Sequence, residues 1–248
     1  MRIAIAGGTG LIGAMVVELV EAVGHQVVVL ARSRGMDLEG GDGVTAALDG
    51  VDAVVDVTNV TTMSARRSTR FFSAVTTNLL AAEQAAGVRH HIALSIVGVE
   101  RAPYGYYAGK RAQERLLEAG PVPWTILRAT QFHEMAVIAY ESARLGPLHL
   151  APRMRTRPVA ARAVAQHLVE LAVGAPAGGV VEIAGPREES LAAMIRAYAL
   201  TTGSRSWTPV VSLPGALGRA QRDGTLLPGA DAVLGRQTFA DWLGALPR

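Results

Sequence analysis

Three evenly spaced glycines separate a strand-like segment from a helical one near the start of the chain. Arg2–Ala6 has the composition of a buried β-strand, and residues 11–23 carry apolar side chains at helical spacing. Between these segments, Gly7, Gly10 and Gly13 have the spacing G-x-x-G-x-x-G. A strand that passes directly into a helix through such a turn predicts the first half of a βαβ unit.

A turn of this kind is suited to an anionic ligand. One glycine permits the tight turn, one lets backbone N–H groups approach a pyrophosphate, and one allows the helix to pack closely on the strand. The positive end of the helix then faces the negative charge. The turn therefore predicts a dinucleotide site, with an ordinary glycine-rich turn as the alternative. The expected contacts are Gly7, Thr9, Gly10, Leu11, Ile12 and Gly13.

Beyond this turn, short β-rich runs alternate with helical periods. The alternation predicts an α/β fold with a Rossmann-type, doubly wound parallel sheet. The stretch between residues 34 and 51 is glycine-rich and too short for a full βαβ unit, so we expect a rudimentary strand near Met36–Leu38 and a short helix near Val44–Leu48. The other expected strands are 26–31, 53–58, 91–97 and 124–129, and the expected helices are 69–86 and 108–119.

After about residue 145 the alternation becomes less regular. No linker rich in proline, glycine or serine divides the sequence. We therefore expect one domain, residues 1–248, with a dinucleotide-binding core at 1–150 and a small C-terminal lobe at 151–248 that covers the substrate. The expected elements here are helices at 159–173, 191–201 and 239–246, strands at 180–183 and 207–211, and N-caps at Ser190 and Thr238.

Composition argues against several classes of function. The 248 residues contain no cysteine, and the histidines and carboxylates lack metal-ligand spacing, so no disulfide and no metal site is expected. The formal net charge is +3 and the arginines are scattered, which argues against nucleic-acid binding. No uncharged segment reaches the roughly 20 residues that cross a bilayer. We expect a soluble, cytoplasmic protein without membrane contact, and a homo-oligomer is compatible with the sequence.

The end of the second expected strand bears on the choice between NAD and NADP. A carboxylate there would bind the adenosine ribose and favour NAD. The sequence has Ala31-Arg32-Ser33-Arg34 instead. Two guanidinium groups and a hydroxyl suit a 2′-phosphate, so Arg32, Ser33 and Arg34 predict NADP(H) in preference to NAD(H). The alternative is a solvated basic loop.

Several segments together resemble the short-chain dehydrogenase/reductase superfamily, and within it the atypical branch of compact, NmrA-like oxidoreductases. The resemblance covers most of the chain and implies that Asp37 and Leu38 border the adenine. We also count Thr58, at the end of strand 53–58, among the cofactor contacts. The segments that carry the resemblance are GGTGLIG (7–13), ARSR (31–34), Asp37-Leu38, LSIVGV (94–99), YYAGKRAQE (106–114), RPVAARAVAQHLVELA (157–172) and EIAGPREESL (182–191).

The resemblance also implies a catalytic group. Ser95 would orient a carbonyl, and Tyr106 and Lys110 would be the general acid and its partner in the pattern Tyr-x-x-x-Lys. Residues four apart share one face of a helix, which supports the pair independently. Because a neighbouring ammonium favours a phenolate, we expect Lys110 to lower the pKa of Tyr106 and also to bind the cofactor. Structural packing within the cluster of tyrosines is the alternative role for Tyr106.

Many members of the superfamily carry an asparagine on the preceding helix that completes a proton relay. Asn78 lies on the expected helix 69–86, but the relay position falls nearer Ala74 or Val75. The sequence therefore assigns no relay residue. This point matters because NmrA-like relatives include proteins that bind the dinucleotide without turning over a substrate.

Three residues are expected to line the substrate pocket. Thr130, Gln131 and Phe132 follow strand 124–129 at its C-terminal end, where ligands of open α/β sheets bind. Further along, the alternating arginines of the segment 153–157 fit either an acidic substrate or a solvated basic edge.

These observations predict an NADP(H)-dependent oxidoreductase that reduces a ketone, a quinone or a similar small carbonyl compound. One alternative is a redox-sensing regulator of the NmrA-like kind that binds NADP without turnover. Another is a sugar-nucleotide epimerase or dehydratase, which is disfavoured because such enzymes usually have a longer C-terminal lobe than this chain can build.

Overall fold

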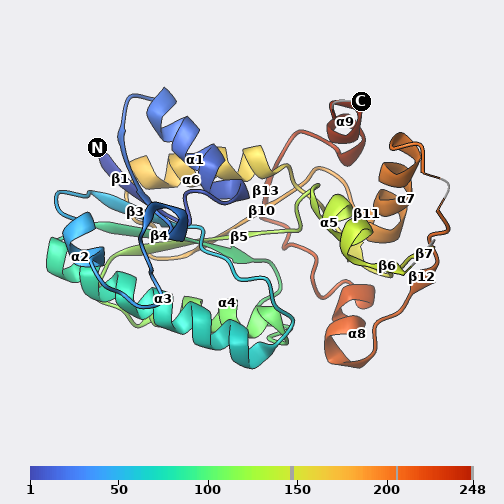
Figure 1. Ribbon diagram of the computed structural model, residues 1–248, viewed down its shortest axis with the longest axis horizontal. Helices are drawn as coiled ribbons and strands as arrows, with labels where there is room; N and C mark the ends of the chain where they lie inside the picture. Colours follow the sequence, from blue (N-terminus) through green and yellow to red (C-terminus); the bar gives the residue numbers. More distant parts are fainter. Residues whose placement is uncertain (146–147, 205, 247–248) are drawn as a thin grey trace. The chain divides into compact units, whose positions relative to one another are not determined.

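Seven strands form one sheet in the order β13-β10-β5-β4-β3-β1-β2 (Figure 1). The computed structural model describes residues 1–145, 148–204 and 206–246. The strand pairs β1–β2, β1–β3, β3–β4 and β10–β13 are all parallel, which confirms the predicted Rossmann-type sheet. The strands are β1 (Arg2–Ala6), β2 (Gln26–Leu30), β3 (Ala53–Asp56), β4 (His90–Ile96), β5 (Trp124–Ala129), β10 (Val180–Ala184) and β13 (Val233–Leu234).

The chain reverses its direction of travel across the sheet at β1. From β1 it moves to β2 on one side, and from β2 it returns to β3 on the other side. In open α/β sheets, ligands bind outside the carboxyl ends of the strands at such a switch point. The fold therefore directs attention to the ends of β1, β2 and β3.

Helices cover both faces of the sheet. Helices α1 (Leu11–Ala22) and α6 (Ala161–Val173) lie on one face, and α3 (Ala65–Ala86) and α4 (Tyr106–Glu118) lie on the other (Figure 1). Helix α3 begins four residues before the predicted start, because the Ser64 hydroxyl caps it by accepting the N–H of Arg67 at 3.3 Å. The predicted positions of α1, α4 and α6 are confirmed within about two residues.

The strand predicted near Met36–Leu38 is wrong. Residues Arg32–Arg34 form a short 3-10 helix, and turns follow as far as the predicted short helix, α2 (Val44–Ala47). Glycines 35, 41 and 43 have positive φ values of 81°, 86° and 77°, so the chain bends repeatedly and does not extend beside another strand. Leu38 is nevertheless buried in the hydrophobic core.

Contacts divide the chain into two compact units. The first contains residues 1–128 and 162–181, and the second contains 129–161 and 182–248. The chain thus passes between the units at three places, whereas one boundary was expected near residue 150. That both units form a single domain, and that the second covers a substrate, stay predictions.

The second unit contains helices that the sequence reveals only in part. Helix α7 (Leu191–Thr201) has the predicted bounds, although the Ser190 side chain makes no capping bond. Helix α9 (Phe239–Gly244) begins with the predicted Thr238, which forms a capping box with Asp241. Strand β12 (Val210–Val211) lies within the predicted strand 207–211. Two helices were not predicted, α5 (Met135–Ser142) and α8 (Gly215–Asp223). The sequence also did not predict the short strands β6 (Arg144–Leu145), β7 (Leu148–His149), β8 (Ala151–Pro152), β9 (Arg155–Thr156) and β11 (Glu189–Ser190).

None of the helices in the described ranges combines the length and the apolar character that a membrane span requires.

Helices α3 and α4 are in close contact at Gly109. A Cβ atom added to Gly109 would overlap the Ser68 hydroxyl and would lie 2.5 Å from the Ser68 carbonyl carbon. The same hydroxyl donates a hydrogen bond of 2.7 Å to the carbonyl of Tyr106. The absence of a side chain at residue 109 therefore sets the distance between the two helices.

Replacing this glycine tests that constraint. Gly109→Ala is expected to lower the free energy of unfolding by about 1–3 kcal/mol, because overpacking must push α4 away from α3. Gly244→Ala is the control, since a Cβ there meets no atom within 4 Å. The control is expected to be neutral or stabilising by up to about 1 kcal/mol. Chemical denaturation of both variants measures the difference, and equal stabilities would contradict the packing argument.

Candidate functional site

A cavity of about 330 Å³ opens at the carboxyl ends of β1, β2 and β3. It lies in the first unit, at the switch point of the sheet. Such clefts are the usual ligand sites of this fold class. The lining residues are Gly7, Thr9, Gly10, Leu30, Ala31, Arg32, Ser33, Met36, Asp37, Leu38, Glu39, Val57, Thr58, Asn59, Phe71 and Val75.

The glycine turn forms one wall of this cavity. Gly7 has φ +82° and donates its N–H to Leu30 O at 2.8 Å, so the turn stays against β2. A Cβ at Gly13 would overlap Gly7 O, and this lack of space explains how the start of α1 packs on the turn. The first intrahelical bond runs from Ala14 N to Gly10 O, so the earlier N–H groups of α1 are left for a ligand.

The predicted phosphate-binding residues do not all reach the cavity. Arg32 and Ser33 line it, and Ser33 donates a hydrogen bond of 3.1 Å to the hydroxyl of Thr9. Arg34 is exposed and does not line it. Leu11, Ile12 and Gly13, in the first turn of α1, are also outside the lining set.

Asp37 and Leu38 also line the cavity, and Asn78 holds the loop that carries them. The Asn78 amide on α3 donates to the carbonyls of Leu38 and Glu39, both at 3.0 Å. Asp37 accepts the N–H of Glu39 at 3.1 Å, which closes the turn. Asn78 therefore supports the cavity wall. Its role depends on a contact about 40 residues away in the sequence, which no local pattern reveals.

Tyr106 and Lys110 contact the cavity through residues that follow β3. The Tyr106 hydroxyl donates to the Asn59 carboxamide oxygen at 2.7 Å. Lys110 is only 3% exposed, and its ammonium lies 3.5 Å from Thr58 O. Thr58 and Asn59 both line the cavity. Asn59 is thus a site residue that the sequence analysis missed.

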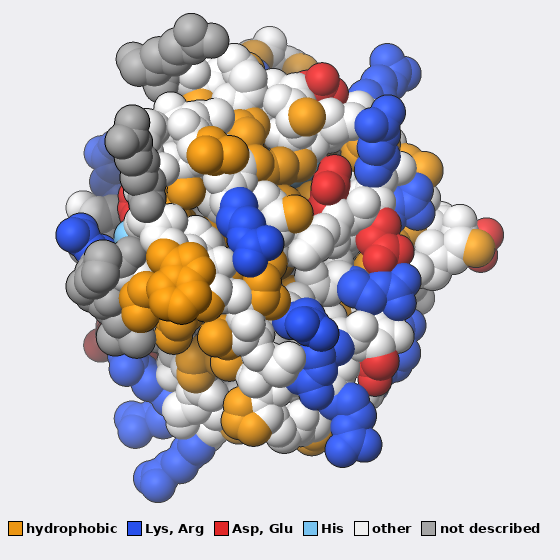
Figure 2. All heavy atoms as spheres, turned by 90° about the vertical axis from the view of Figure 1, so that its right-hand side faces the viewer, with side chains coloured by type: hydrophobic (Ala, Val, Ile, Leu, Met, Phe, Trp, Pro, Cys, Tyr) orange, Lys and Arg blue, Asp and Glu red, His pale blue; other side chains and the backbone are white. Residues whose placement is uncertain are grey.

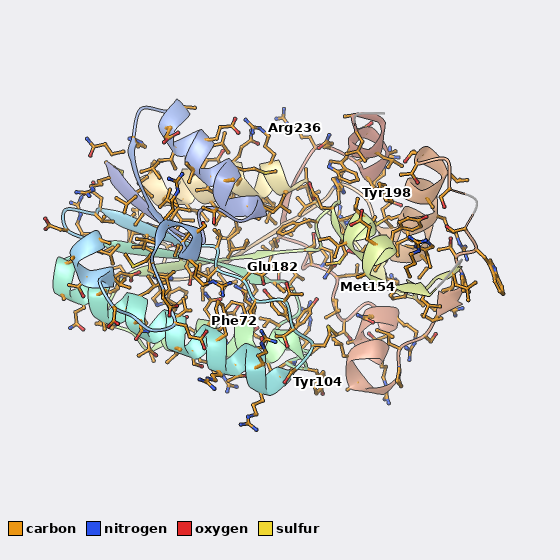
Figure 3. The ribbon with its side chains drawn as sticks, viewed as in Figure 1. Phe72, Tyr104, Met154, Glu182, Tyr198 and Arg236 are labelled. Carbon is orange, nitrogen blue, oxygen red and sulfur yellow. The ribbon has the colours of Figure 1, made fainter. Side chains whose placement is uncertain are left out.

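Phe72 on α3, which is labelled in Figure 3, lies against both members of the Tyr-x-x-x-Lys pair. The Lys110 ammonium is 4.2 Å from the centre of its ring, and the rings of Phe72 and Tyr106 meet edge to face at 5.6 Å. These are favourable cation–π and aromatic geometries. Phe72 is the second site residue that the sequence did not reveal.

Ser95 lies on β4 and is 2% exposed. Its hydroxyl has no hydrogen-bond partner among the residues that the structure describes. The preceding carbonyl, Leu94 O, accepts a hydrogen bond of 2.8 Å from Lys110. A buried hydroxyl without a partner is uncommon and is available to a ligand.

The three residues predicted to line a substrate pocket belong to the second unit. Thr130 donates to Arg157 O at 2.6 Å, and Gln131 accepts a bond of 2.6 Å from Thr156. Phe132 forms a bridge with Val159. These polar groups hold the second unit together, so their contact with a substrate stays a prediction.

The alternating arginines of the second unit are largely paired. Arg155 forms an ion pair of 2.7 Å with Glu188, and Arg157 donates to Pro186 O at 3.1 Å. Figure 2 shows basic side chains dispersed among apolar, acidic and uncharged ones on the face it presents. Two of the three arginines of 153–157 thus have partners within the second unit, and the choice between a solvated basic edge and an acidic-substrate site stays a prediction.

A family model described as NAD(P)H-binding matches residues 7–173. The match includes the glycine turn, the cavity and helix α4. The chain belongs to this NAD(P)H-binding family. No curated protein matches the chain.

Solved structures confirm the resemblance to the short-chain dehydrogenase/reductase superfamily at the level of fold. An NADPH-dependent quinone oxidoreductase from Escherichia coli is 18% identical, with a TM-score of 0.72 over 98% of each chain. A superfamily protein from Agrobacterium tumefaciens with bound NAD is 19% identical, with a TM-score of 0.71 over 98% of this chain and 95% of that one. A UDP-glucose 4-epimerase from Stenotrophomonas maltophila with bound NAD is 19% identical, with a TM-score of 0.73 over 98% and 96%.

The residues present fit an NAD(P) dinucleotide. The turn leaves no room for a Cβ at Gly13, which brings the amino end of α1 close to the cavity. Arg32 lines the cavity and its guanidinium has no partner among the described residues, so it can receive an anionic group. The hydroxyls of Thr9 and Ser33 lie beside it. The family's NAD(P)H binding therefore has a matching cradle in this chain.

The electrostatics of the Tyr-x-x-x-Lys pair differ from the expectation. Burial raises the pKa of Tyr106 above its ordinary value of 10.0, and Tyr107 and Asp56 add to the rise. Burial lowers the pKa of Lys110 to about 8, against the opposing effect of Asp56 and Glu114. The Lys110 ammonium is directed to backbone and amide oxygens, and Lys110 is not among the groups that shift the pKa of Tyr106.

A tyrosine titration tests this state. The difference in near-ultraviolet absorbance between the wild type and Tyr106→Phe isolates one phenol. In the absence of a nucleotide we expect that phenol to ionise well above pH 10, because burial disfavours the charged form. Ionisation below pH 10 would show that a cation acts on Tyr106, as the sequence alone predicted.

Proposed function

We propose that the protein is an NADP(H)-dependent oxidoreductase that reduces a ketone, quinone or similar carbonyl compound by hydride transfer. The observation that carries the proposal is that Tyr106 and Lys110 on α4 reach the wall of the cavity at Asn59 and Thr58. The NADPH-dependent quinone oxidoreductase among the structural neighbours is consistent with it. A cytoplasmic location and self-association are further parts of the proposal that rest on the sequence alone.

The chain holds the dinucleotide through three groups of residues. The first-turn N–H groups of α1 bind the pyrophosphate. Arg32 and Ser33 bind a 2′-phosphate, since no carboxylate ends β2. Asp37 and Leu38 border the adenine. When bound, the reduced nicotinamide supplies the hydride.

The chain's own contribution to the reaction is a proton and its stabilisation. Tyr106 donates its hydroxyl proton to the carbonyl oxygen, and Ser95 donates a hydrogen bond to the same oxygen. Because burial makes a lone phenolate at Tyr106 costly, the Lys110 ammonium is required to stabilise it. Lys110 also binds the nicotinamide ribose. Asn59 fixes the direction of the Tyr106 hydroxyl before the substrate enters.

The choice of cofactor is tested by separating the two arginines. Arg32→Ala is expected to reduce the preference for NADPH over NADH by roughly tenfold or more, the value of one charge-assisted contact. Arg34→Ala is the matched control and is expected to leave the preference intact, because Arg34 does not line the cavity. Titration calorimetry with both nucleotides measures the effect. Equal losses in the two variants would mean that general basic charge, and no specific contact, selects the phosphate.

The role of Tyr106 is tested by removing one hydroxyl. Tyr106→Phe is expected to lower turnover roughly 10²–10⁴-fold while the affinity for NADPH changes little, because only the general acid is lost. Tyr104→Phe removes the same group from an exposed neighbour and is expected to be mild. A screen of quinones and ketones by NADPH oxidation supplies the substrate. Near-wild-type turnover of Tyr106→Phe would exclude the tyrosine mechanism.

One observation favours a second candidate, an NADP-binding regulator without turnover. The three protons of the Lys110 ammonium are all directed to oxygens of the protein, at Leu94, Gln113 and Thr58. In this arrangement the general acid lacks its cationic partner. NADPH binding that changes association with another protein, together with no reduction of any carbonyl compound, would establish this candidate.

A further inference from the structure

The chain contains a single lysine, and it is Lys110. All the other Lys and Arg positions, of the 24 in the sequence, hold arginine. The two side chains are not interchangeable, because an ammonium presents three donors from one compact centre whereas a guanidinium presents a planar fork. The one departure from arginine falls on a buried position of α4.

Three oxygens from three parts of the first unit surround the ammonium. Leu94 O on β4 accepts a bond of 2.8 Å, Gln113 Oε1 on α4 accepts one of 2.9 Å, and Thr58 O after β3 lies at 3.5 Å. The Phe72 ring covers the ammonium from α3 at 4.2 Å. Gln113 is the only side chain among the three acceptors.

A carboxylate stands behind Gln113. The Gln113 amide nitrogen donates to Asp56 Oδ2 at 2.7 Å. The other oxygen of Asp56 accepts the N–H and the hydroxyl of Thr58, at 2.9 and 2.6 Å. Asp56 and Gln113 are both 0% exposed. The chain Asp56–Gln113–Lys110 is thus a continuous, buried path of hydrogen bonds from the end of β3 to α4.

Two carboxylates, Asp56 and Glu114, act on the charge of Lys110, and Asp56 makes no direct hydrogen bond to a cationic group among the described residues. Glu114, the other acid that acts on Lys110, forms two hydrogen bonds of 2.8 and 2.7 Å with Arg128. The charge of Asp56 also acts to raise the pKa of His91, but the His91 ring is hydrogen-bonded to Glu83 at 2.7 Å. The charges that face this region therefore leave Asp56 as the counter-charge of Lys110, transmitted through the Gln113 amide.

We propose that Asp56 and Gln113 are positioning residues for Lys110, the amide fixing the direction of the ammonium and the buried carboxylate keeping it charged. The side chain that supports Lys110 is then Gln113, three residues further along α4. Asn78 on α3 instead holds the Leu38–Glu39 loop. What Lys110 does for a reaction rests on the proposed function. How Lys110 is held does not, and the two are tested separately.

The single lysine makes the test direct. Protein labelled with ¹³C at the lysine ε-carbon gives one side-chain signal, whose chemical shift reports the titration of Lys110. The wild-type midpoint is expected near pH 8. Asp56→Asn is expected to lower it by about one pH unit or more, because a nearby opposite charge stabilises the ammonium. Gln113→Met removes the acceptor at nearly the same volume and is expected to lower the midpoint as well.

Glu118→Gln is the matched control. It also exchanges a carboxylate for an amide in the same region, but Glu118 bonds to Arg111 at 2.9 Å and does not contribute to the charge state of Lys110. Its midpoint is expected to equal that of the wild type. Circular dichroism and thermal unfolding establish which variants are folded. Should Asp56→Asn not fold, Gln113→Met decides the question alone.

A second readout connects the arrangement to the cofactor. If protonated Lys110 binds the ribose, NADPH affinity falls as pH rises through the Lys110 midpoint, and in Asp56→Asn this fall occurs at lower pH. Unchanged midpoints in folded Asp56→Asn or Gln113→Met would overturn the positioning proposal. Lowered midpoints in a protein that reduces no carbonyl compound would support the positioning and count against the proposed reaction only.

Discussion

The close approach of α3 and α4 is the constraint on which the site depends. Because Gly109 has no side chain, α4 rests directly on the Ser68 backbone, and the Ser68 hydroxyl binds the first turn of α4. Phe72 lies one turn further along α3, where it contacts the side chains of Tyr106 and Lys110. A larger residue at 109 would separate the helices and remove this shared surface. The chemistry proposed for α4 thus requires a packing contact that is itself chemically inert.

Buried charges then fix α3 and α4 against the sheet. Glu114 on α4 binds Arg128 on β5 through both oxygens, Glu83 on α3 binds His91 on β4, and Lys110 is balanced by Asp56 after one intervening amide. An unpaired charge in such an interior is strongly unfavourable, so each pair resists displacement of its helix. These bonds specify one arrangement of the helices, whereas apolar contacts alone tolerate several.

Local patterns predicted the elements, and distant contacts decided the site. The glycine turn, β1 to β5 and the first four helices follow from periodicity and capping, which are properties of neighbouring residues. The strand near Met36–Leu38 failed because positive-φ glycines outweighed the apolar pattern. Asn59 and Phe72 were missed because their partners lie on other elements. Gln113 was missed because its second partner, Asp56, is 57 residues away in the sequence. Packing of α4 against both α3 and the end of β3 brings these groups together.

The Tyr-x-x-x-Lys spacing shows how far helical geometry carries a functional argument. Four-residue spacing places the Cβ atoms of Tyr106 and Lys110 on one face, but it does not bring the hydroxyl to the ammonium. The hydroxyl binds Asn59 in the cavity lining, and the ammonium binds Leu94 O on β4 and Gln113 on α4. Joint action requires that at least one of these bonds be exchanged for a bond to a ligand. A ligand shifts such an equilibrium only by binding the joined state more tightly than the separated one. A ribose hydroxyl or a carbonyl oxygen that lies between Tyr106 and Lys110 favours the joined state, because it accepts a hydrogen bond from one of these side chains while it contacts the other.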